Sequence, residues 1–222
     1  MLSMIDNLER LNRKERFFLI GRVLGNPNFR MDAKFRTELG SAFHLDVPED
    51  AFVAMDYHLN WIYAAAVLTF STPEGDRIYD NGGKFIDGTQ EDVDLLVAFT
   101  DKSNTSHLIM LEAKGVTAFS NKQFRHKMDR FKIIYGDNGQ LWQNQVKPYF
   151  GFISPRRPQR LLLDKCPLWL KVDNEIPWLE LPIPGNRLAV FGCDEAGEPN
   201  EERAFWTIRN EMTRRVKFNS VI

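Results

Sequence analysis

Apolar residues in the first part of the chain recur at the three- and four-residue spacing that is typical of helices. This spacing holds from Ile5 to Leu24 and predicts a helix over residues 1–24. The Gly-Asn-Pro-Asn sequence that follows is expected to end it. Asp32 is placed to cap a second helix, which should bury an apolar stripe and end near His44.

Residues 51–70 carry two patterns at once. Apolar and polar residues alternate over residues 55–61, as in a strand, whereas residues 63–68 suit a helix equally well. We interpret this region as a helical stretch that leads into a strand. Residues 73–89 are rich in Gly, Asp and Asn and predict a long loop, a kind of segment that is often functional in a compact domain.

The middle of the chain predicts two neighbouring strands and a helix. Residues 93–99 and 107–111 are short apolar runs that suit buried strands, and residues 101–105 suit the hairpin turn between them. Residues 120–135 have the apolar spacing of an amphipathic helix. Residues 149–154 predict a further strand between two prolines.

The C-terminal third contains many prolines and two strand-like runs, at residues 187–193 and 204–208. No linker, repeat or low-complexity tract separates it from the rest, so we treat residues 1–222 as a single domain. Helices that alternate with strands over this length predict an α/β protein.

Composition limits the classes of protein to which the chain can belong. With 43% of its residues apolar, it can bury a substantial core, yet no apolar stretch approaches the roughly 18 residues that span a membrane. The net charge of −1 excludes a purely electrostatic DNA binder, so any nucleic-acid contact must come from a local basic patch.

The cysteines and the N-terminal residues indicate in which cellular compartment the protein is expected. Cys166 and Cys193 cannot by themselves form a disulfide framework or a four-ligand zinc site. We expect two buried free thiols, and the alternative is a single bridge between them. Asp6, Glu9 and Arg10 interrupt the apolar segment that a secretory leader would need. We therefore expect a soluble cytoplasmic protein without a membrane partner.

Two acids and a lysine are expected to meet at one end of the two central strands. Side chains alternate along a strand, so Glu112 and Lys114 point to the same side. Asp94 begins the preceding strand and reaches the same end if the two strands pair as a hairpin. Asp92 is an alternative because it shares a face with Asp94, but the apolar run begins directly after Asp94 and favours that residue.

Such a group suits phosphodiester hydrolysis. The carboxylates of Asp94 and Glu112 are hard oxygen ligands for Mg²⁺, and the backbone carbonyl of Ala113 is placed to add a further ligand. A bound metal would activate a water and neutralise charge on the phosphate. Lys114 would orient or deprotonate that water and stabilise the developing charge.

These residues resemble a known family. The segment Val93-Asp94-Leu95-Leu96, followed on the next strand by Leu111-Glu112-Ala113-Lys114-Gly115 and then by a helix, is similar to the PD-(D/E)XK nuclease superfamily, also called restriction-endonuclease-like. Val93 replaces the proline of the motif. The resemblance covers roughly residues 32–155. It implies a three-layer fold, in which a central mixed sheet is flanked by helices in the order αβββαβ, and cleavage of nucleic acid that depends on Mg²⁺ or Mn²⁺.

The resemblance further implies an accessory glutamate on the first core helix, and Glu38 is the best candidate for this metal ligand. It lies at the margin of the buried stripe of that helix. The alternative is a surface glutamate paired with a nearby base such as Lys34.

The helix after the motif carries Gln123, Lys127 and Arg130 in one stripe beside its apolar face. These residues are candidates for substrate contacts, and Gln123 resembles a glutamine found after the motif in some family members. The alternative is a capping box, in which Gln123 and Ser120 only close the N-terminus of the helix. None of the histidines has metal-ligand spacing.

Three hypotheses follow from the sequence. The first is a Mg²⁺-dependent nuclease acting on DNA, with a homodimer as a further expectation because restriction-like enzymes that cut both strands commonly dimerise. The second is a catalytically inactive module on the same fold that binds nucleic acid or protein. The third is an unrelated α/β domain, which predicts that Asp94 lies far from Glu112.

Overall fold

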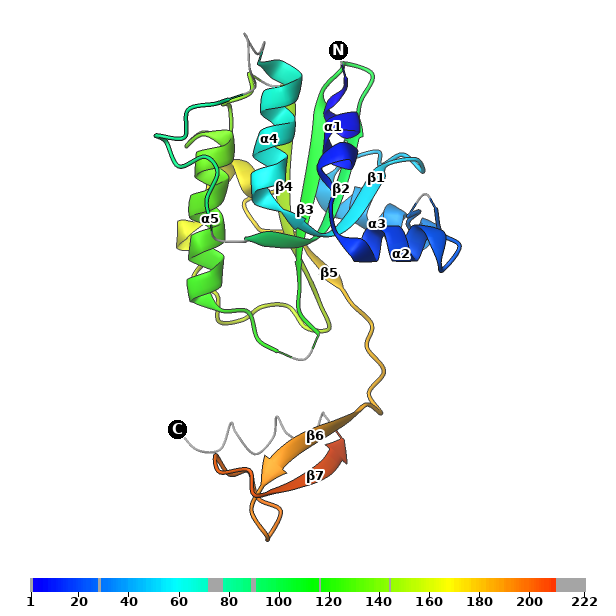
Figure 1. Ribbon diagram of the computed structural model, residues 1–222, viewed down its shortest axis with the longest axis vertical. Coiled ribbons are helices and arrows are strands. Elements are labelled where there is room, and N and C mark those ends of the chain that lie inside the picture. The colour runs from blue at the N-terminus through cyan, green and yellow to red at the C-terminus, as the bar shows by residue number, and fades with distance from the viewer. Residues whose placement is uncertain are drawn as a thin grey trace. The chain divides into compact units, whose positions relative to one another are not determined.

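In the computed structural model of the protein, a five-stranded mixed sheet in the order β1-β2-β3-β4-β5 forms the centre of the unit Met1–Leu181 (Figure 1). The first three strands pair antiparallel, whereas β4 runs parallel to β3 and β5 runs parallel to β4. The strands are β1 (Phe52–His58), β2 (Asp92–Thr100), β3 (Ser106–Ala113), β4 (Val146–Ser154) and β5 (Trp178–Glu180). The protein is therefore α/β with a mixed central sheet, as predicted.

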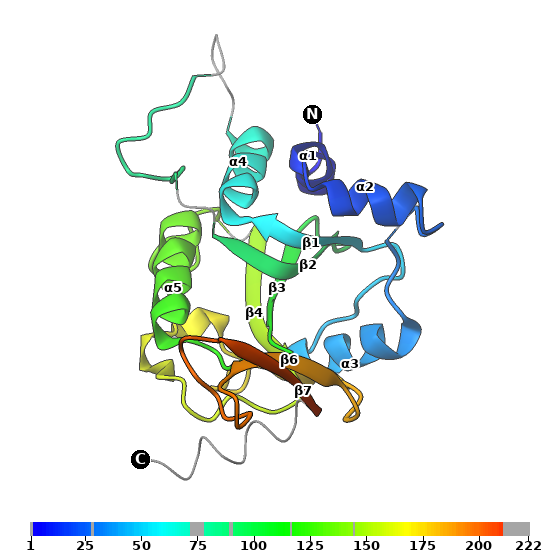
Figure 2. The same cartoon turned by 60° about the horizontal axis from the view of Figure 1, so that its bottom comes forward.

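Helices cover both faces of the sheet, and Figure 2 shows α5 and α3 on opposite sides of it. Apolar residues of α1, α4 and α5 form one core cluster with the sheet, and those of α3 form a second cluster on the other face. The helices are α1 (Met4–Leu11), α2 (Glu15–Arg22), α3 (Ala33–Phe43), α4 (Leu59–Phe70) and α5 (Asn121–Tyr135), with short 3₁₀ turns η1 (Leu163–Lys165) and η2 (Leu168–Leu170).

The structure describes residues 2–27, 29–71, 78–88, 91–115, 117–143 and 145–210, and the chain divides into two compact units. The sheet and its helices belong to the first unit, Met1–Leu181. The second unit, Pro182–Ile222, contains the antiparallel strands β6 (Leu188–Cys193) and β7 (Phe205–Asn210), which confirms both predicted C-terminal strands. The single domain expected over the whole chain stays a prediction.

Several elements lie where the sequence places them. Asp32 caps α3, since its Oδ1 accepts hydrogen bonds from the backbone N–H groups of Lys34 and Phe35. The predicted strands at 93–99, 107–111 and 149–154 correspond to β2, β3 and β4. All four residues of the predicted apolar stripe of α5 are buried, namely Phe124, Met128, Phe131 and Tyr135.

Two predictions for the first 70 residues are wrong in detail. The helix expected over residues 1–24 is broken into α1 and α2, because the backbone is extended at Asn12 and at Lys14, whose side chain reaches Asp92. In residues 51–70 the order is reversed, with strand β1 first and helix α4 after it. The alternating pattern continues past His58, the last residue of the strand, and so conceals where the helix begins.

Other predictions concern loops, cysteines and membrane crossing. Residues 78–88 contain no helix or strand, as expected for a loop, whereas residues 73–77 and 89 of the predicted loop lie outside the described residues. Cys166 and Cys193 are free and buried, as predicted. Among the described helices, none has the length and apolar character that crossing a bilayer requires.

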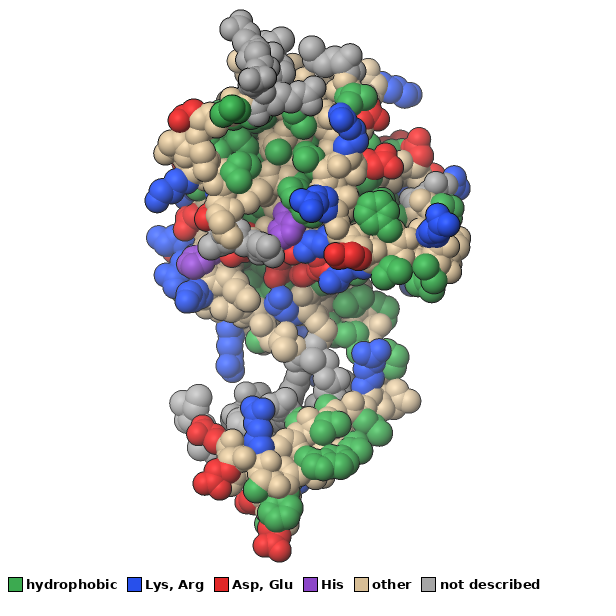
Figure 3. Space-filling view, in the orientation of Figure 1, with side chains coloured by type: hydrophobic (Ala, Val, Ile, Leu, Met, Phe, Trp, Pro, Cys, Tyr) green, Lys and Arg blue, Asp and Glu red, His purple; other side chains and the backbone are tan. Residues whose placement is uncertain are grey.

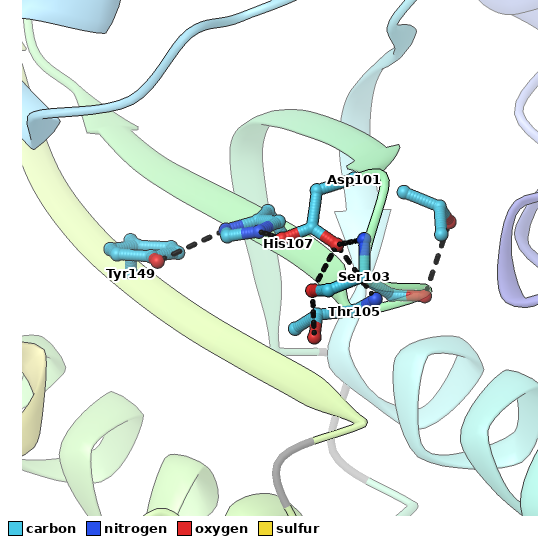
Figure 4. A network of polar contacts seen from close by, with 7 residues as sticks. Asp101, Ser103, Thr105, His107 and Tyr149 are labelled. Carbon is cyan, nitrogen blue, oxygen red and sulfur yellow. Dashed lines mark hydrogen bonds and ion pairs between the residues drawn. The ribbon is translucent and has the colours of Figure 1, made fainter.

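The hairpin turn between β2 and β3 is held by a network of polar side chains (Figure 4). Asp101 accepts hydrogen bonds from the Ser103 hydroxyl and from the backbone N–H groups of Ser103 and Thr105. His107 Nε2 lies 2.9 Å from Asp101 Oδ2, and His107 Nδ1 lies 3.0 Å from the Tyr149 hydroxyl. The hydrogen bond from His107, followed by those from Ser103 and Thr105, lowers the pKa of Asp101 well below its usual range.

We expect the Asp101→Asn variant to be less stable than the wild type at pH 7. The difference in free energy of unfolding between the two proteins should become smaller in acid. Because folding lowers the pKa of Asp101, its carboxylate stabilises the folded protein above the ordinary pKa of 3.8, and that contribution disappears as the pH falls further. Urea unfolding of both proteins at pH 7, 4 and 3 measures the difference in free energy of unfolding. The exposed Asp129, replaced by Asn, is the control. A difference that stays constant with pH would contradict the role of this carboxylate.

Candidate active site at the ends of β2 and β3

Asp94, Glu112 and Lys114 meet at one end of the neighbouring strands β2 and β3. The two strands pair from Leu95–Leu111 onwards, and beyond that pair the Asp94 carboxylate accepts a hydrogen bond of 2.6 Å from the backbone N–H of Ala113. Lys114 Nζ donates to Glu112 Oε1 at 2.9 Å. The structure therefore brings together the three residues that the sequence analysis singled out, on strands that form the predicted hairpin.

Helix α5 adds a second lysine to this group. Lys127 Nζ donates to Glu112 Oε2 and, at 2.6 Å, to the backbone carbonyl of Asp92. Only 5% of Lys127 is exposed, so its ammonium is buried against the end of the sheet. Glu112 lies on the same side of β3 as Leu108 and Met110, which pack against α5, and this is why Lys127 can reach it.

The two carboxylates and two ammonium groups alter each other's protonation. Burial and the charge of Glu112 raise the pKa of Asp94, although the Ala113 N–H and both lysines oppose that rise. Burial lowers the pKa of Lys114, but the hydrogen bond and charge of Glu112, together with Asp94, outweigh it, so the pKa lies above its usual value. Lys114 therefore holds its proton as long as Glu112 is its partner.

Asp92, the alternative to Asp94, belongs to a neighbouring ion-pair group. Its carboxylate lies 2.9 Å from Lys14 Nζ and 3.1 Å from His58 Nδ1. Burial lowers the pKa of His58, and the charge of Asp92 opposes this effect. Asp92 is half-buried, and its side chain pairs with Lys14, between α1 and α2, and with His58, at the end of β1. Asp94 is thus the carboxylate that lies beside Glu112 without a partner in this neighbouring group.

Glu38 is not brought to this group. It lies on α3, whose buried residues Leu39 and Phe43 pack on the face of the sheet opposite to α5. Its side chain is 48% exposed, and its carboxylate lies 3.7 Å from Lys34 Nζ. The structure therefore shows the surface pair that was the alternative interpretation of Glu38.

Gln123 lies beside the group, at the edge of a pocket. Ser120 makes no side-chain hydrogen bond at the start of α5, so the capping box that would have explained Gln123 is not formed. Gln123 is exposed, and it lines the pocket next to Glu112. The pocket is lined by Glu112, Lys114, Phe119, Ser120, Gln123, Phe124, Lys127, Phe150 and Phe152.

The side chain of Arg130 is buried and forms hydrogen bonds within the protein. Its guanidinium donates to the backbone carbonyls of Lys84 and Phe85 at 3.0 and 2.7 Å, and to Asn60 Oδ1 at 2.8 Å. The ring of Phe85 in turn stacks on Tyr63 of α4, with ring centres 4.9 Å apart. Arg130 thus fixes the loop at residues 78–88 against α4 and α5, a role that its position in the sequence did not indicate.

The donors for a metal ion at this place are oxygen atoms. Among the residues that the structure describes, no three His, Cys, Asp or Glu side chains form a metal-binding cluster. The available set is the carboxylates of Asp94 and Glu112 with the backbone carbonyl of Ala113, which are hard ligands that suit Mg²⁺ or Mn²⁺. A buried cation, the Lys127 ammonium, already lies against Glu112 and a second carbonyl. The donors therefore fit a divalent cation.

Figure 3 shows acidic and basic side chains side by side across the middle of this face of the first unit. Lys14 and His58 pair with Asp92, and Asn60 accepts a hydrogen bond from Arg130, yet no sequence pattern pointed to these three residues. Each has a partner that is distant in sequence, which only the fold reveals. Comparisons with protein-family models, with curated proteins and with solved structures find no match to this chain.

We expect Arg130→Met to loosen the loop at residues 78–88. Loss of hydrogen bonds from a charged donor costs about 1.5–3 kcal/mol, so the loop should open at least about tenfold more often. Limited digestion with trypsin measures this as faster cleavage after Lys84. Arg125→Met is the matched control, because Arg125 is exposed on the same helix and donates to the backbone carbonyl of Asn121 in the first turn of that helix. Equal cleavage of the wild type and Arg130→Met would contradict this role.

Proposed function

We propose that this protein is a metal-dependent nuclease that hydrolyses phosphodiester bonds, with DNA as its substrate. Asp94 and Glu112 are the metal-binding carboxylates and Lys114 is the catalytic lysine. The observation that carries the proposal is the convergence of these three side chains at one end of β2 and β3. The third hypothesis, an unrelated domain, required Asp94 to lie far from Glu112.

The order of elements also supports the proposal. Helix α3, the antiparallel strands β1 to β3, helix α5 and the parallel strand β4 follow one another as αβββαβ, with α4 inserted between β1 and β2. This is the order that the resemblance to the PD-(D/E)XK superfamily implies. The acidic residues lie on the second and third strands of the sheet, directly before the crossover helix, as the motif requires.

The residues of the site have distinct parts in this proposal. A divalent cation held by Asp94, Glu112 and the Ala113 carbonyl would supply an activated water and neutralise charge on the phosphate. Lys114 stays protonated beside Glu112, and its ammonium group would form a hydrogen bond to a phosphate oxygen on which charge builds up. Gln123, at the edge of the adjacent pocket, would position the nucleic acid strand.

One observation favours the second candidate, an inactive binding module on the same fold. Lys114 and Lys127 together satisfy both oxygens of Glu112, so the site is electrically balanced by protein groups alone. In that case the cluster would serve the stability of the fold, and nucleic acid or protein would bind without reaction. Cleavage assays separate the two candidates directly.

We expect the purified protein to cleave DNA only when Mg²⁺ or Mn²⁺ is present. Linear, circular and single-stranded DNA are tested together with RNA, so that the assay also identifies the substrate. Glu112→Gln and Lys114→Met should each lower the rate by about 100-fold or more, since each removes a group that acts on the developing charge.

Lys102→Ala is the control, because Lys102 is exposed in the hairpin turn at the other end of β2 and β3. Cleavage that persists in both site variants would show that another site, or a contaminant, is responsible. Absence of cleavage with every substrate and metal would favour the binding module. Dimer formation stays a prediction, and the mass of the protein in solution decides it.

A further inference from the structure

The ammonium of Lys127 occupies the place of a cation among oxygen atoms. It contacts Glu112 Oε2 on β3 and the backbone carbonyl of Asp92 on β2, and it is buried between these strands and α5. Asp94 lies at the same end of the two strands as Glu112, and its carboxylate accepts a hydrogen bond from the backbone N–H of Ala113. These are the same carboxylates that the proposed function assigns to a metal ion.

The charges of the site balance only while it contains no metal. Asp94 and Glu112 contribute two negative charges, and Lys114 and Lys127 contribute two positive charges. A divalent cation bound to both carboxylates would lie next to the buried ammonium, and the two positive charges would repel each other in a region of low dielectric constant. The metal and the ammonium of Lys127 therefore compete for Glu112.

The side chain of Lys127 borders a pocket. Its side chain has a flexible four-carbon stem, and it lines the pocket that opens beside Glu112, together with Gln123 and Ser120. Lys114 also binds Glu112, but it uses the other carboxylate oxygen and has 20% of its side chain exposed, against 7% for Lys127. Lys127 is the lysine that fills the interior position.

We propose, as an extension that rests on the proposed function, that Lys127 is a displaceable counter-cation. Its ammonium occupies the cation position of the site, and a divalent metal binds to Asp94 and Glu112 by displacing that ammonium into the adjacent pocket. This makes Lys127 a positioning residue. In the absence of metal it keeps the two carboxylates compensated, and after the exchange it places a positive charge in the pocket, where phosphate oxygens would lie next to it.

Metal affinity tests the proposal without any measurement of cleavage. Mn²⁺ is titrated by calorimetry into the full-length wild type, Lys127→Met and Lys127→Arg, with nucleic acid left out. Methionine keeps the length of the side chain and removes the charge, so Lys127→Met should bind Mn²⁺ at least tenfold more tightly than the wild type. Lys127→Arg keeps the charge and should bind no more tightly than the wild type.

The outcomes separate this inference from the proposed function. Equal Mn²⁺ affinity in the wild type and Lys127→Met overturns the competition while the metal site stands. Absence of Mn²⁺ binding in every variant overturns the metal site and the competition with it. Binding by Lys127→Met alone supports the competition but shows that the wild type excludes the metal, which argues against a metal-dependent nuclease.

A second measurement uses only the wild type, so it does not depend on the folding of a variant. An amine-reactive reagent is applied with and without Mn²⁺, and mass spectrometry quantifies the modification of each lysine. Lys127 should be protected without metal and become several-fold more reactive with it, whereas the exposed Lys102 should not change. Unchanged reactivity of Lys127 when Mn²⁺ is bound overturns the displacement.

Discussion

The charge of Glu112, at the end of the central strand of the sheet, has to be neutralised by neighbouring side chains, and this requirement constrains which residues surround it. β3 lies between β2 and β4, and its residues from Ser106 to Leu111 are buried, so the carboxylate that follows has little access to water. A carboxylate in such a place costs several kcal/mol unless it is paired and hydrogen-bonded. Lys114 from the same strand and Lys127 from α5 supply that pairing, one on each oxygen. The position of α5 against the sheet is thus tied to the electrostatics of the site.

Helix α5 connects the core, the site and the loop at residues 78–88. Its apolar stripe packs into the sheet and fixes the rotation of the helix about its axis. That rotation places Lys127 against Glu112 and, one turn later, Arg130 against the loop carbonyls. These three contacts are therefore coupled through α5. A rotation of the helix that alters the packing of the stripe would also move Lys127 away from Glu112 and Arg130 away from the loop.

Much of this arrangement is present in local sequence patterns. β2, β3, α3 and α5 follow from apolar periodicity, and the meeting of Asp94 with Glu112 follows from strand alternation across a tight hairpin. Contacts between distant segments could not be derived in this way. Lys14, where the first helix is interrupted, pairs with Asp92, and Arg130 binds the backbone carbonyls of Lys84 and Phe85. The stripe of Lys127 and Arg130 was visible in the sequence, but its partners depend on how α5 crosses the sheet.

A site that balances its own charges does not need metal in order to fold. In small metal-dependent domains the unfolded chain has no preformed site, so metal binding and folding are one event. Here Lys114 and Lys127 compensate Asp94 and Glu112 within the folded protein, and the apolar core on both faces of the sheet is complete without an ion. If the site binds metal as we propose, metal loading is thereby separated from folding and is an exchange of one cation for another. Under this proposal the free energy of that exchange, and not the geometry of the carboxylates, decides whether the site takes up a metal ion.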